Sequence, residues 1–376
     1  MYIKSLIYED QSINWKLELM EFKPLTLLVG VSGVGKTKIL NALLNLKDFS
    51  KGTFIAGFKW EIVFTVNEGV NYKWRGEIEG QITSGNLFEF ESYPKTNWNN
   101  PPIYYEQLFI NDELIIDRNN DGIYFDNKQI VQLPRNSSIL FLFKEISTIQ
   151  VVYESFDRII TNDVFRIKNE VVSFKDLKNK LIKSDIHFIR SNIKTIAEKL
   201  YLCRKNVPDI FEEIKYLFID IFPHVEDLIV DTLSSLSPNT NYISIAIKEK
   251  YVDYLIHEEQ MSLGMLKTLT HIAELYLCAD GSVILIDEFE NSLGINCINE
   301  ITSSILASER NLQFIITSHH PYIINAIDTQ YWKVVTRKGS VVKVIDAKEL
   351  GIGKSKHEKF MQLINLHEYT DGITYE

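Results

Sequence analysis

The sequence predicts an α/β fold built on a mixed β-sheet, with an antiparallel β subdomain and a helical insertion. An apolar run at Leu25–Val29 is followed by a glycine-rich loop and then by leucines at helical spacing. Between residues 54 and 132, aromatic and β-branched residues alternate with polar ones, for example over residues 58–66, as in antiparallel strands. Up to about residue 318, helical and strand patterns then alternate, which is the order of parallel strands joined by crossover helices.

The same patterns divide the chain into three parts. Residues 1–136 and 228–376 are expected to form the two parts of one α/β unit. Residues 137–227 carry apolar residues at a spacing near 3.6, for example at Phe174, Leu177 and Leu181, and predict a mostly helical insertion. The apolar positions of this insertion are expected to serve packing.

Composition indicates an ordinary soluble globular protein. Hydrophobic residues make up 45% of the 376 residues and charged residues 24%. No apolar stretch reaches the roughly 18 residues that a membrane span needs, and the alternating N-terminus does not resemble a secretory signal. The three cysteines, Cys203, Cys278 and Cys297, suit neither a zinc site nor a disulfide framework, so we expect a reducing cytoplasm.

The charge balance bears on partners. A net charge of −10 argues against nonspecific coating of nucleic acid, because phosphate contacts need a local excess of Lys and Arg. A small basic patch remains compatible with this balance. Nucleic acid is therefore left open as a partner, without support from the sequence.

The glycine-rich loop carries a complete G-x-x-x-x-G-K-[ST] pattern. Its residues are Gly30, Val31, Ser32, Gly33, Val34, Gly35, Lys36 and Thr37. In this pattern, backbone N–H groups of the loop and the helix N-terminus surround phosphates. Lys36 is expected to reach the β- and γ-phosphates of ATP, and the Thr37 hydroxyl is expected to bind Mg²⁺. A chance glycine-rich turn would lack the strand before it and the helix after it.

A second apolar run, Val283–Ile286, ends in Asp287 and Glu288. Carboxylates at the C-terminal end of a buried parallel strand lie where open α/β sheets bind ligands. We expect Asp287 to hold Mg²⁺, directly or through water, and Glu288 to orient and polarise the attacking water as a general base. Taken alone, such a run more often ends in a solvated strand terminus; its pairing with the loop at residues 30–37 favours catalysis.

Two further segments refine the prediction. Ser262 and Gly264 open a helix that precedes Val283 and would form another anion site at a helix N-terminus. One γ-phosphate does not need two phosphate-binding sites in one chain, so we expect Ser262 and Gly264 to complete the site of a second copy. The alternative is that Ser262 is an ordinary serine N-cap. His319 follows the strand Phe314–Thr317 and is expected to contact the γ-phosphate, although a histidine at a strand end is more often structural.

Together these segments resemble the ABC-type, AAA-family P-loop ATPases of the RecF, SMC and overcoming-lysogenisation-defect (OLD) group. The motifs occur in the family's order: Walker A at Gly30–Thr37, signature at Ser262–Gly264, Walker B at Val283–Glu288, a D-loop-like segment at Glu290–Gly294 and a switch histidine at His319. Residues 1–136 then hold Walker A and the antiparallel β subdomain of an ATPase head, and residues 228–376 hold the other motifs. The resemblance is close over residues 1–50 and 228–325 and general elsewhere.

The sequence also departs from the family pattern. Relatives usually place Asn where this chain has Ser32, and the signature begins with Met and lacks an acidic residue or Gln after Gly264. A Q-loop glutamine is not assigned, since Gln107, Gln129 and Gln132 all fall at suitable places. About fifty residues follow Pro321, too few for the nuclease domain of OLD proteins, so we expect a stand-alone ATPase that does not itself cut nucleic acid.

The resemblance implies an ATPase that uses ATP and Mg²⁺, dimerises head-to-tail around ATP as a homodimer or higher oligomer, and regulates a separately encoded nuclease or toxin in bacterial anti-phage defence. Two alternatives remain at this stage. One is a RecF-like DNA maintenance or repair ATPase that clamps DNA, against which the acidic balance counts. The other is a non-catalytic nucleotide-binding scaffold, against which the intact Lys36 and Glu288 count.

Overall fold

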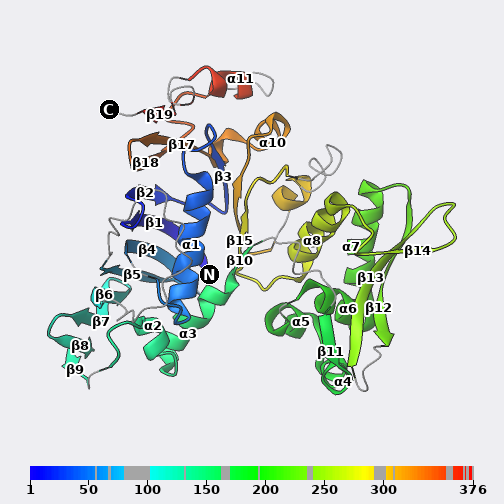
Figure 1. Cartoon of the computed structure of the whole chain (residues 1–376), viewed down its shortest axis with the longest axis horizontal. Coiled ribbons are helices and arrows are strands. Elements are labelled where there is room, and N and C mark those ends of the chain that lie inside the picture. Colours follow the sequence, from blue (N-terminus) through cyan, green and yellow to red (C-terminus); the bar gives the residue numbers. More distant parts are fainter. Residues whose placement is uncertain are drawn as a thin grey trace, which may run out of the picture.

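The chain folds into two lobes, one around a long β-sheet and one of helices around a short sheet (Figure 1). The computed structural model describes residues 1–55, 57–66, 69–79, 102–130, 133–161, 170–193, 195–234, 240–291, 302–307, 310–352, 359–366, 369 and 372–374.

The long sheet is mixed. Its strands are β1 (Tyr2–Asp10), β2 (Trp15–Glu21), β3 (Leu25–Val29), β4 (Phe58–Val66), β5 (Val70–Ile78), β6 (Ile103–Ile110), β7 (Glu113–Asn119), β8 (Gly122–Phe125), β9 (Lys128–Gln129), β10 (Ile159–Thr161), β15 (Val283–Ile286), β16 (Gln313–Thr317), β17 (Trp332–Lys338), β18 (Val341–Asp346) and β19 (Ile373–Thr374). Their order is β10-β15-β16-β3-β17-β18-β2-β1-β4-β5-β6-β7-β8-β9, with β19 beside β17. Neighbours from β10 to β17 are parallel, whereas those from β2 to β9 are antiparallel. The predicted mixed α/β fold with an antiparallel β subdomain is confirmed.

The short sheet belongs to the second lobe. It contains β11 (Glu170–Ser173), β12 (Val225–Ser234), β13 (Thr240–Glu249) and β14 (Leu255–His257). Its order is β11-β13-β12, and β14 also pairs with β13. The sequence pattern identified only the region of β13 and β14 as a β segment.

Helices cover both sheets. They are α1 (Lys36–Ser50), α2 (Ile139–Leu142), α3 (Ser147–Ser155), α4 (Phe174–Lys183), α5 (Ile186–Asn192), α6 (Ile196–Asn206), α7 (Pro208–Ile221), α8 (Leu263–Leu277), α10 (Pro321–Ala326) and α11 (Lys359–Ile364), with the 3-10 helices η1 (Phe156–Arg158) and η3 (Thr329–Tyr331). Residues 302–307 are also helical. The stretch 137–227 is mostly helical as expected, yet β10 joins the edge of the long sheet and β11 joins the short one. The three-part division itself stays a prediction.

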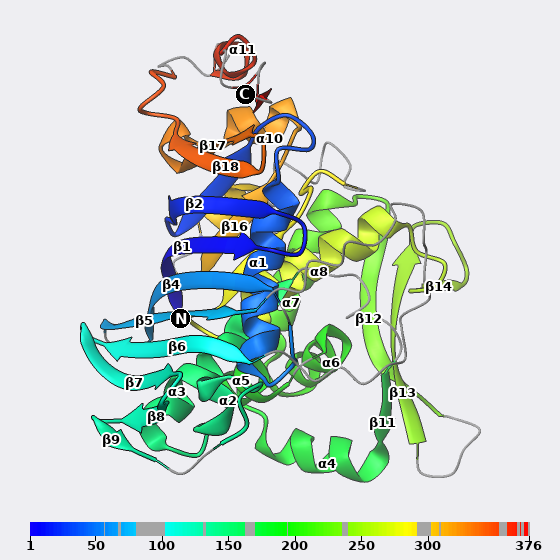
Figure 2. The same cartoon turned by 60° about the vertical axis from the view of Figure 1, so that its left-hand side comes forward.

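The central parallel strands are buried on both faces, which explains why their sequences are apolar throughout. In β3, Leu27 and Val29 belong to one hydrophobic core and Leu28 to the other, since successive side chains point to opposite faces. Helix α8 contributes to the first core and α1 to the second. Figure 2 shows α1 lying across strands β1, β2 and β4. The two helices that open at candidate phosphate sites therefore lie on opposite faces of one sheet.

Candidate functional site

The glycine-rich loop connects β3 to α1 and is shaped by close backbone contacts. A Cβ at Gly30 would lie 2.6 Å from the main-chain oxygen of Val335 on β17, so only glycine fits there. Gly35 is the N-cap of α1 with a left-handed φ of 109°, and no side chain caps this helix. The first-turn N–H groups of α1 are thus left without a side-chain acceptor, as an anion site requires.

Other loop residues differ in exposure. Ser32, Gly33 and Thr37 are exposed, whereas Val34 is buried against the sheet. Val34 therefore anchors the loop and can offer a bound phosphate only its main chain. The exposed residues present the concave side of the loop to solvent.

Lys36 is 6% exposed and folds back over the loop. Its Nζ donates to the main-chain oxygens of Gly30, at 2.8 Å, and Val31, at 3.1 Å. Burial lowers the pKa of Lys36 to about 8, and the carboxylates of Asp287, Glu290 and Glu288 oppose this shift. An additional negative charge, such as a phosphate, would stabilise the protonated amine.

Thr37 and Asp287 meet although 250 residues separate them in the chain. The Thr37 hydroxyl donates to Asp287 Oδ1 at 3.1 Å, because α1 begins and β15 ends at the same edge of the sheet. Two oxygen ligands bound at right angles, each about 2.0–2.1 Å from Mg²⁺, lie about 2.9 Å apart. The hydroxyl and carboxylate therefore fit the edge of a magnesium coordination shell. No group of three or more His, Cys, Asp or Glu residues within the described ranges could hold a metal, so phosphate and water would complete the shell.

Glu288 adopts a left-handed φ of 46°, which is unusual for a non-glycine residue. Its backbone N–H donates to Thr317 Oγ1 at 2.7 Å, and the same hydroxyl donates to Asp287 Oδ1 at 2.6 Å. Thr317 thus fixes both acidic residues from the neighbouring strand β16. The side chain of Glu288 is exposed at this edge, with Asn291 Nδ2 at 3.4 Å from Oε2.

His319 lies at the same edge, after β16. Its backbone N–H donates to Glu290 Oε1 at 2.7 Å, while Glu290 Oε2 is buried without a hydrogen-bond partner among the described residues. Burial and the positive charge of Lys36 lower the pKa of His319. The carboxylates of Glu290, Glu288 and Asp287 raise it, but they do not cancel the shift. The imidazole is therefore favoured in its neutral form.

Ser262 and Gly264 lie elsewhere. Ser262 is the N-cap of α8, and its Oγ accepts from the backbone N–H of Met265 at 3.2 Å. Ser262 is exposed and Gly264 is partly exposed. Within the described part of the chain, no hydrogen bond or ion pair joins either residue to Lys36 or Asp287. One chain thus brings together Lys36, Thr37, Asp287, Glu288 and His319, but not the signature residues.

The Q-loop candidates do not reach this edge in the contacts described. Gln107 bonds Arg75 and Asp117 within the antiparallel sheet, and Gln129 bonds the main chain of Asp121. Gln132 lies outside the described residues, as do residues 292–294 of the D-loop-like segment. No role was predicted for Thr317. The signal that could have indicated one is a hydroxyl residue at the end of the strand next to β15.

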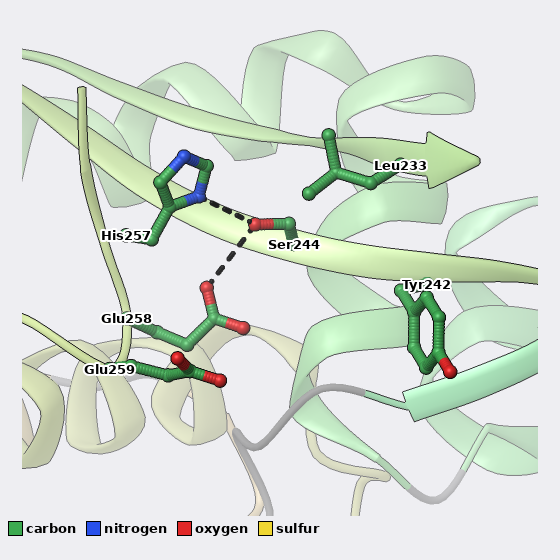
Figure 3. A pocket seen from close by; sticks show the side chains of 6 residues that line it. All are labelled: Leu233, Tyr242, Ser244, His257, Glu258 and Glu259. Atoms are coloured by element: carbon green, nitrogen blue, oxygen red, sulfur yellow. Dashed lines mark hydrogen bonds between the residues drawn. The ribbon is translucent and has the colours of Figure 1, made fainter. Parts of the chain in front are cut away.

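A pocket of 320 Å³ on the short sheet contains a second group of polar side chains, separate from the glycine-rich loop (Figure 3). Ser244 Oγ lies 3.1 Å from His257 Nδ1 and donates to Glu258 Oε2 at 3.3 Å. The carboxylate thus contacts the serine rather than the imidazole, and it also accepts the backbone N–H of Ile245 at 3.0 Å. In a hydrolase triad the carboxylate orients the histidine, so this arrangement does not activate Ser244 as a nucleophile.

Solved structures with a similar fold include heads of SMC proteins. The Smc head bound to the C-winged helix domain of ScpA has a TM-score of 0.53 and 17% identity, over 92% of this chain and 97% of that one. The Smc head with an extended coiled coil, bound to the C-terminal domain of ScpA derived from Pyrococcus furiosus, has a TM-score of 0.51 and 16% identity, over 93% and 98% of the two chains. No curated protein sequence matches the chain.

The fold is that of an ABC-type P-loop ATPase head, with a Walker-type edge formed by β3, α1, β15 and β16. More narrowly, the chain belongs to the AAA-domain family described as putative AbiEii toxin, type IV TA system, whose model matches residues 25–325. No helix in the described ranges is both long and apolar enough to span a membrane.

Proposed function

We propose that this chain binds ATP with Mg²⁺ and hydrolyses it to ADP and phosphate. The loop N–H groups and Lys36 hold the phosphates, and Thr37 and Asp287 hold the ion, which neutralises phosphate charge when bound. Glu288 accepts a proton from the attacking water, and the neutral His319 donates a hydrogen bond to the γ-phosphate.

The observation that carries this proposal is the contact between Thr37 and Asp287 beside the buried Lys36. A hydroxyl, a carboxylate and an ammonium group from two distant segments lie close together at the N-terminus of α1, which no side chain caps. Asp287 is exposed, and the hydroxyls of Thr317 and Thr37 both donate to its carboxylate and orient it toward the loop.

We further propose that two copies assemble head-to-tail around ATP. Ser262 and Gly264 of one copy then complete the phosphate site of the other. Support comes from the exposure of Ser262 at the N-terminus of α8 and from its lack of described contacts to the chain's own Walker residues. The hydrogen bond from Lys267 Nζ to the main-chain oxygen of Asn291, at 2.9 Å, links α8 to the Walker B edge.

The biological role proposed is control of a separately encoded effector, a nuclease or toxin, in bacterial anti-phage defence in the cytoplasm. The family description refers to a type IV toxin–antitoxin system, which supports a role in growth arrest rather than metabolism. The Smc heads with this fold are bound to a domain of another protein, ScpA, which supports a head that acts through a partner. Strands β17 and β18 belong to the long sheet, so we assign the region up to Asp346 to the ATPase head and no nuclease activity to it.

Phosphate release from ATP tests the catalytic part of the proposal. Glu288→Gln removes the proton acceptor while keeping the side-chain shape, and turnover should fall by about 10²–10⁴-fold. Glu113→Gln, on the exposed start of β7, is the matched control and should keep the wild-type rate. Normal turnover by Glu288→Gln, or no ATP hydrolysis by the wild-type chain, contradicts the assignment.

A further inference from the structure

A large cavity lies between the two lobes, away from the glycine-rich loop. It has a volume of 680 Å³ and is lined from the first lobe by α1, α3, η1 and β10, and from the second by α5, α6 and the segment after α8. Ser282, directly before β15, lines it, whereas Asp287 follows the other end of that strand. Four residues of strand span about 13 Å, so this cavity and the Walker edge lie at opposite ends of β15.

The cavity is basic in a chain whose net charge is −10. Its cationic lining residues are Lys47, Arg158, Arg190 and Lys199, and its acidic ones are Glu154 and Asp157. Asp157 is already paired with Lys51 at 2.8 Å, and Glu154 accepts from Gln150 at 2.8 Å. Lys199 is paired with the buried Glu274 at 3.9 Å. The remaining cations, Lys47, Arg158 and Arg190, still outnumber the remaining carboxylate of the lining, that of Glu154.

Two of the cationic lining residues, Arg158 and Arg190, each donate a single hydrogen bond within the described part of the chain. Arg158 Nη1 donates to the main-chain oxygen of Asp280 at 2.8 Å, and Arg190 Nε donates to that of Tyr276 at 2.9 Å. Neither forms an ion pair with a carboxylate in the parts of the chain that the structure describes. A guanidinium has five N–H donors, so most donors of each side chain remain available.

The nearest compensating charges do not remove this excess. The Asp280 carboxylate is bonded to Arg310 at 2.6 Å. The carbonyl end of α8 contributes only about half a negative charge. Burial lowers the pKa of Arg190 and the nearby Arg310 lowers it further, while the Asp280 carboxylate opposes this shift.

We propose that this cavity binds a phosphate-bearing ligand through Arg158 and Arg190. Arginine forks bind phosphate oxygens in pairs, and a polyvalent anion matches the surplus of cations better than a single carboxylate does. The site is separate from the ATP site and goes beyond the ATPase function proposed above. The ligand is either a free oligophosphate compound or the backbone of a nucleic acid strand, which share this chemistry.

Calorimetric titration of the full-length Lys36→Ala chain, in EDTA, separates this site from the Walker loop. The probes are inorganic tripolyphosphate and a ten-nucleotide single-stranded DNA. One probe at least should bind, and Arg158→Gln or Arg190→Gln should weaken binding at least tenfold. Arg75→Gln, on β5 in the antiparallel region, is the matched control and should change nothing.

The pattern across the probes distinguishes the two sources. Binding of tripolyphosphate alone identifies a free ligand, and tighter binding of the oligonucleotide identifies a nucleic acid backbone. The proposal is overturned if neither probe binds, or if binding is indifferent to both arginine substitutions. Because Lys36 is already replaced, these outcomes do not depend on whether the chain hydrolyses ATP.

A measurement on the Lys36→Ala chain without arginine substitutions covers the case in which those variants fail to fold. Cys278 and Cys203 are both buried in the same hydrophobic core, but only Cys278 also lines the cavity. The bound probe should slow alkylation of Cys278 more than that of Cys203, as followed by mass spectrometry. Equal effects on both cysteines contradict a ligand in this cavity.

Discussion

The Walker edge and the start of α8 are both proposed anion sites at a helix N-terminus, but they differ in how their polar groups are satisfied. At the Walker edge, the hydroxyls of Thr37 and Thr317 both donate to Asp287 Oδ1, which joins three separate segments. At the start of α8, Ser262 bonds only the first turn of its own helix and is exposed. The Walker edge is assembled within one chain. At the start of α8, by contrast, no other described segment of the same chain bonds the Ser262 side chain.

The half of the proposed site that depends on assembly is therefore the start of α8. Substitutions at the Walker edge should act on an isolated chain. Substitutions at Ser262 should act only when two copies meet.

The largest effect is expected for Ser262→Arg. A bulky cation at the N-terminus of α8 adds positive charge to the positive end of the helix and blocks approach of a second copy. ATP turnover should fall by at least about 100-fold while the isolated chain binds ATP as before, as measured by calorimetry alongside phosphate release. Ser262→Ala is the milder control: it removes the N-cap, costs about 1 kcal/mol of stability and leaves room for assembly. Loss of ATP binding by Ser262→Arg would place Ser262 in the chain's own site.

A pH dependence is expected only at the Walker edge. The pKa of Lys36 is about 8 in the free chain, and bound phosphate favours the protonated amine. ATP affinity should therefore be constant below pH 8 and weaken above it, by up to about tenfold per pH unit. Dissociation constants from pH 7 to 9.5 measure this, and Lys36→Arg, which stays protonated, should abolish the dependence. A flat profile for the wild-type chain contradicts the burial of a titrating Lys36 in the phosphate site.

A smaller effect is expected for Thr317→Val, which keeps the side-chain shape but removes the hydroxyl that fixes Asp287 and Glu288. Turnover should fall roughly tenfold, because both acidic residues lose a hydrogen bond worth about 1 kcal/mol each. ATP-dependent assembly should persist. An unchanged rate would show that the two acidic residues are held without Thr317.

The sequence predicted the central fold well because its parallel strands are apolar on both faces and end in polar motifs. The loop at residues 30–37 and the strand before Asp287 could be assigned from local pattern alone. The role of Thr317 could not, because it depends on the register that pairs Ile286 with Ile316 and so brings the next residues side by side. Strand β10 was missed for a similar reason: three residues within a helical stretch give no periodicity.

The site shows the same limit. The sequence motifs predicted that Thr37 and Asp287 share one site, but not that Lys36 bonds the oxygens of its own loop or that Glu288 takes a left-handed φ. Both features arise from backbone packing around the loop and strand. The basic cavity likewise joins α1 to α5 and α6 across the two lobes, and no local pattern relates these segments.

Light-scattering mass of the Glu288→Gln chain, with and without ATP and Mg²⁺, tests the shared site most directly. One chain has a mass of 43.6 kDa. The account predicts that this mass doubles only when ATP is present, and that adding Ser262→Arg restores the single-chain mass while ATP stays bound. A single-chain mass at full ATP occupancy, without the second substitution, contradicts it.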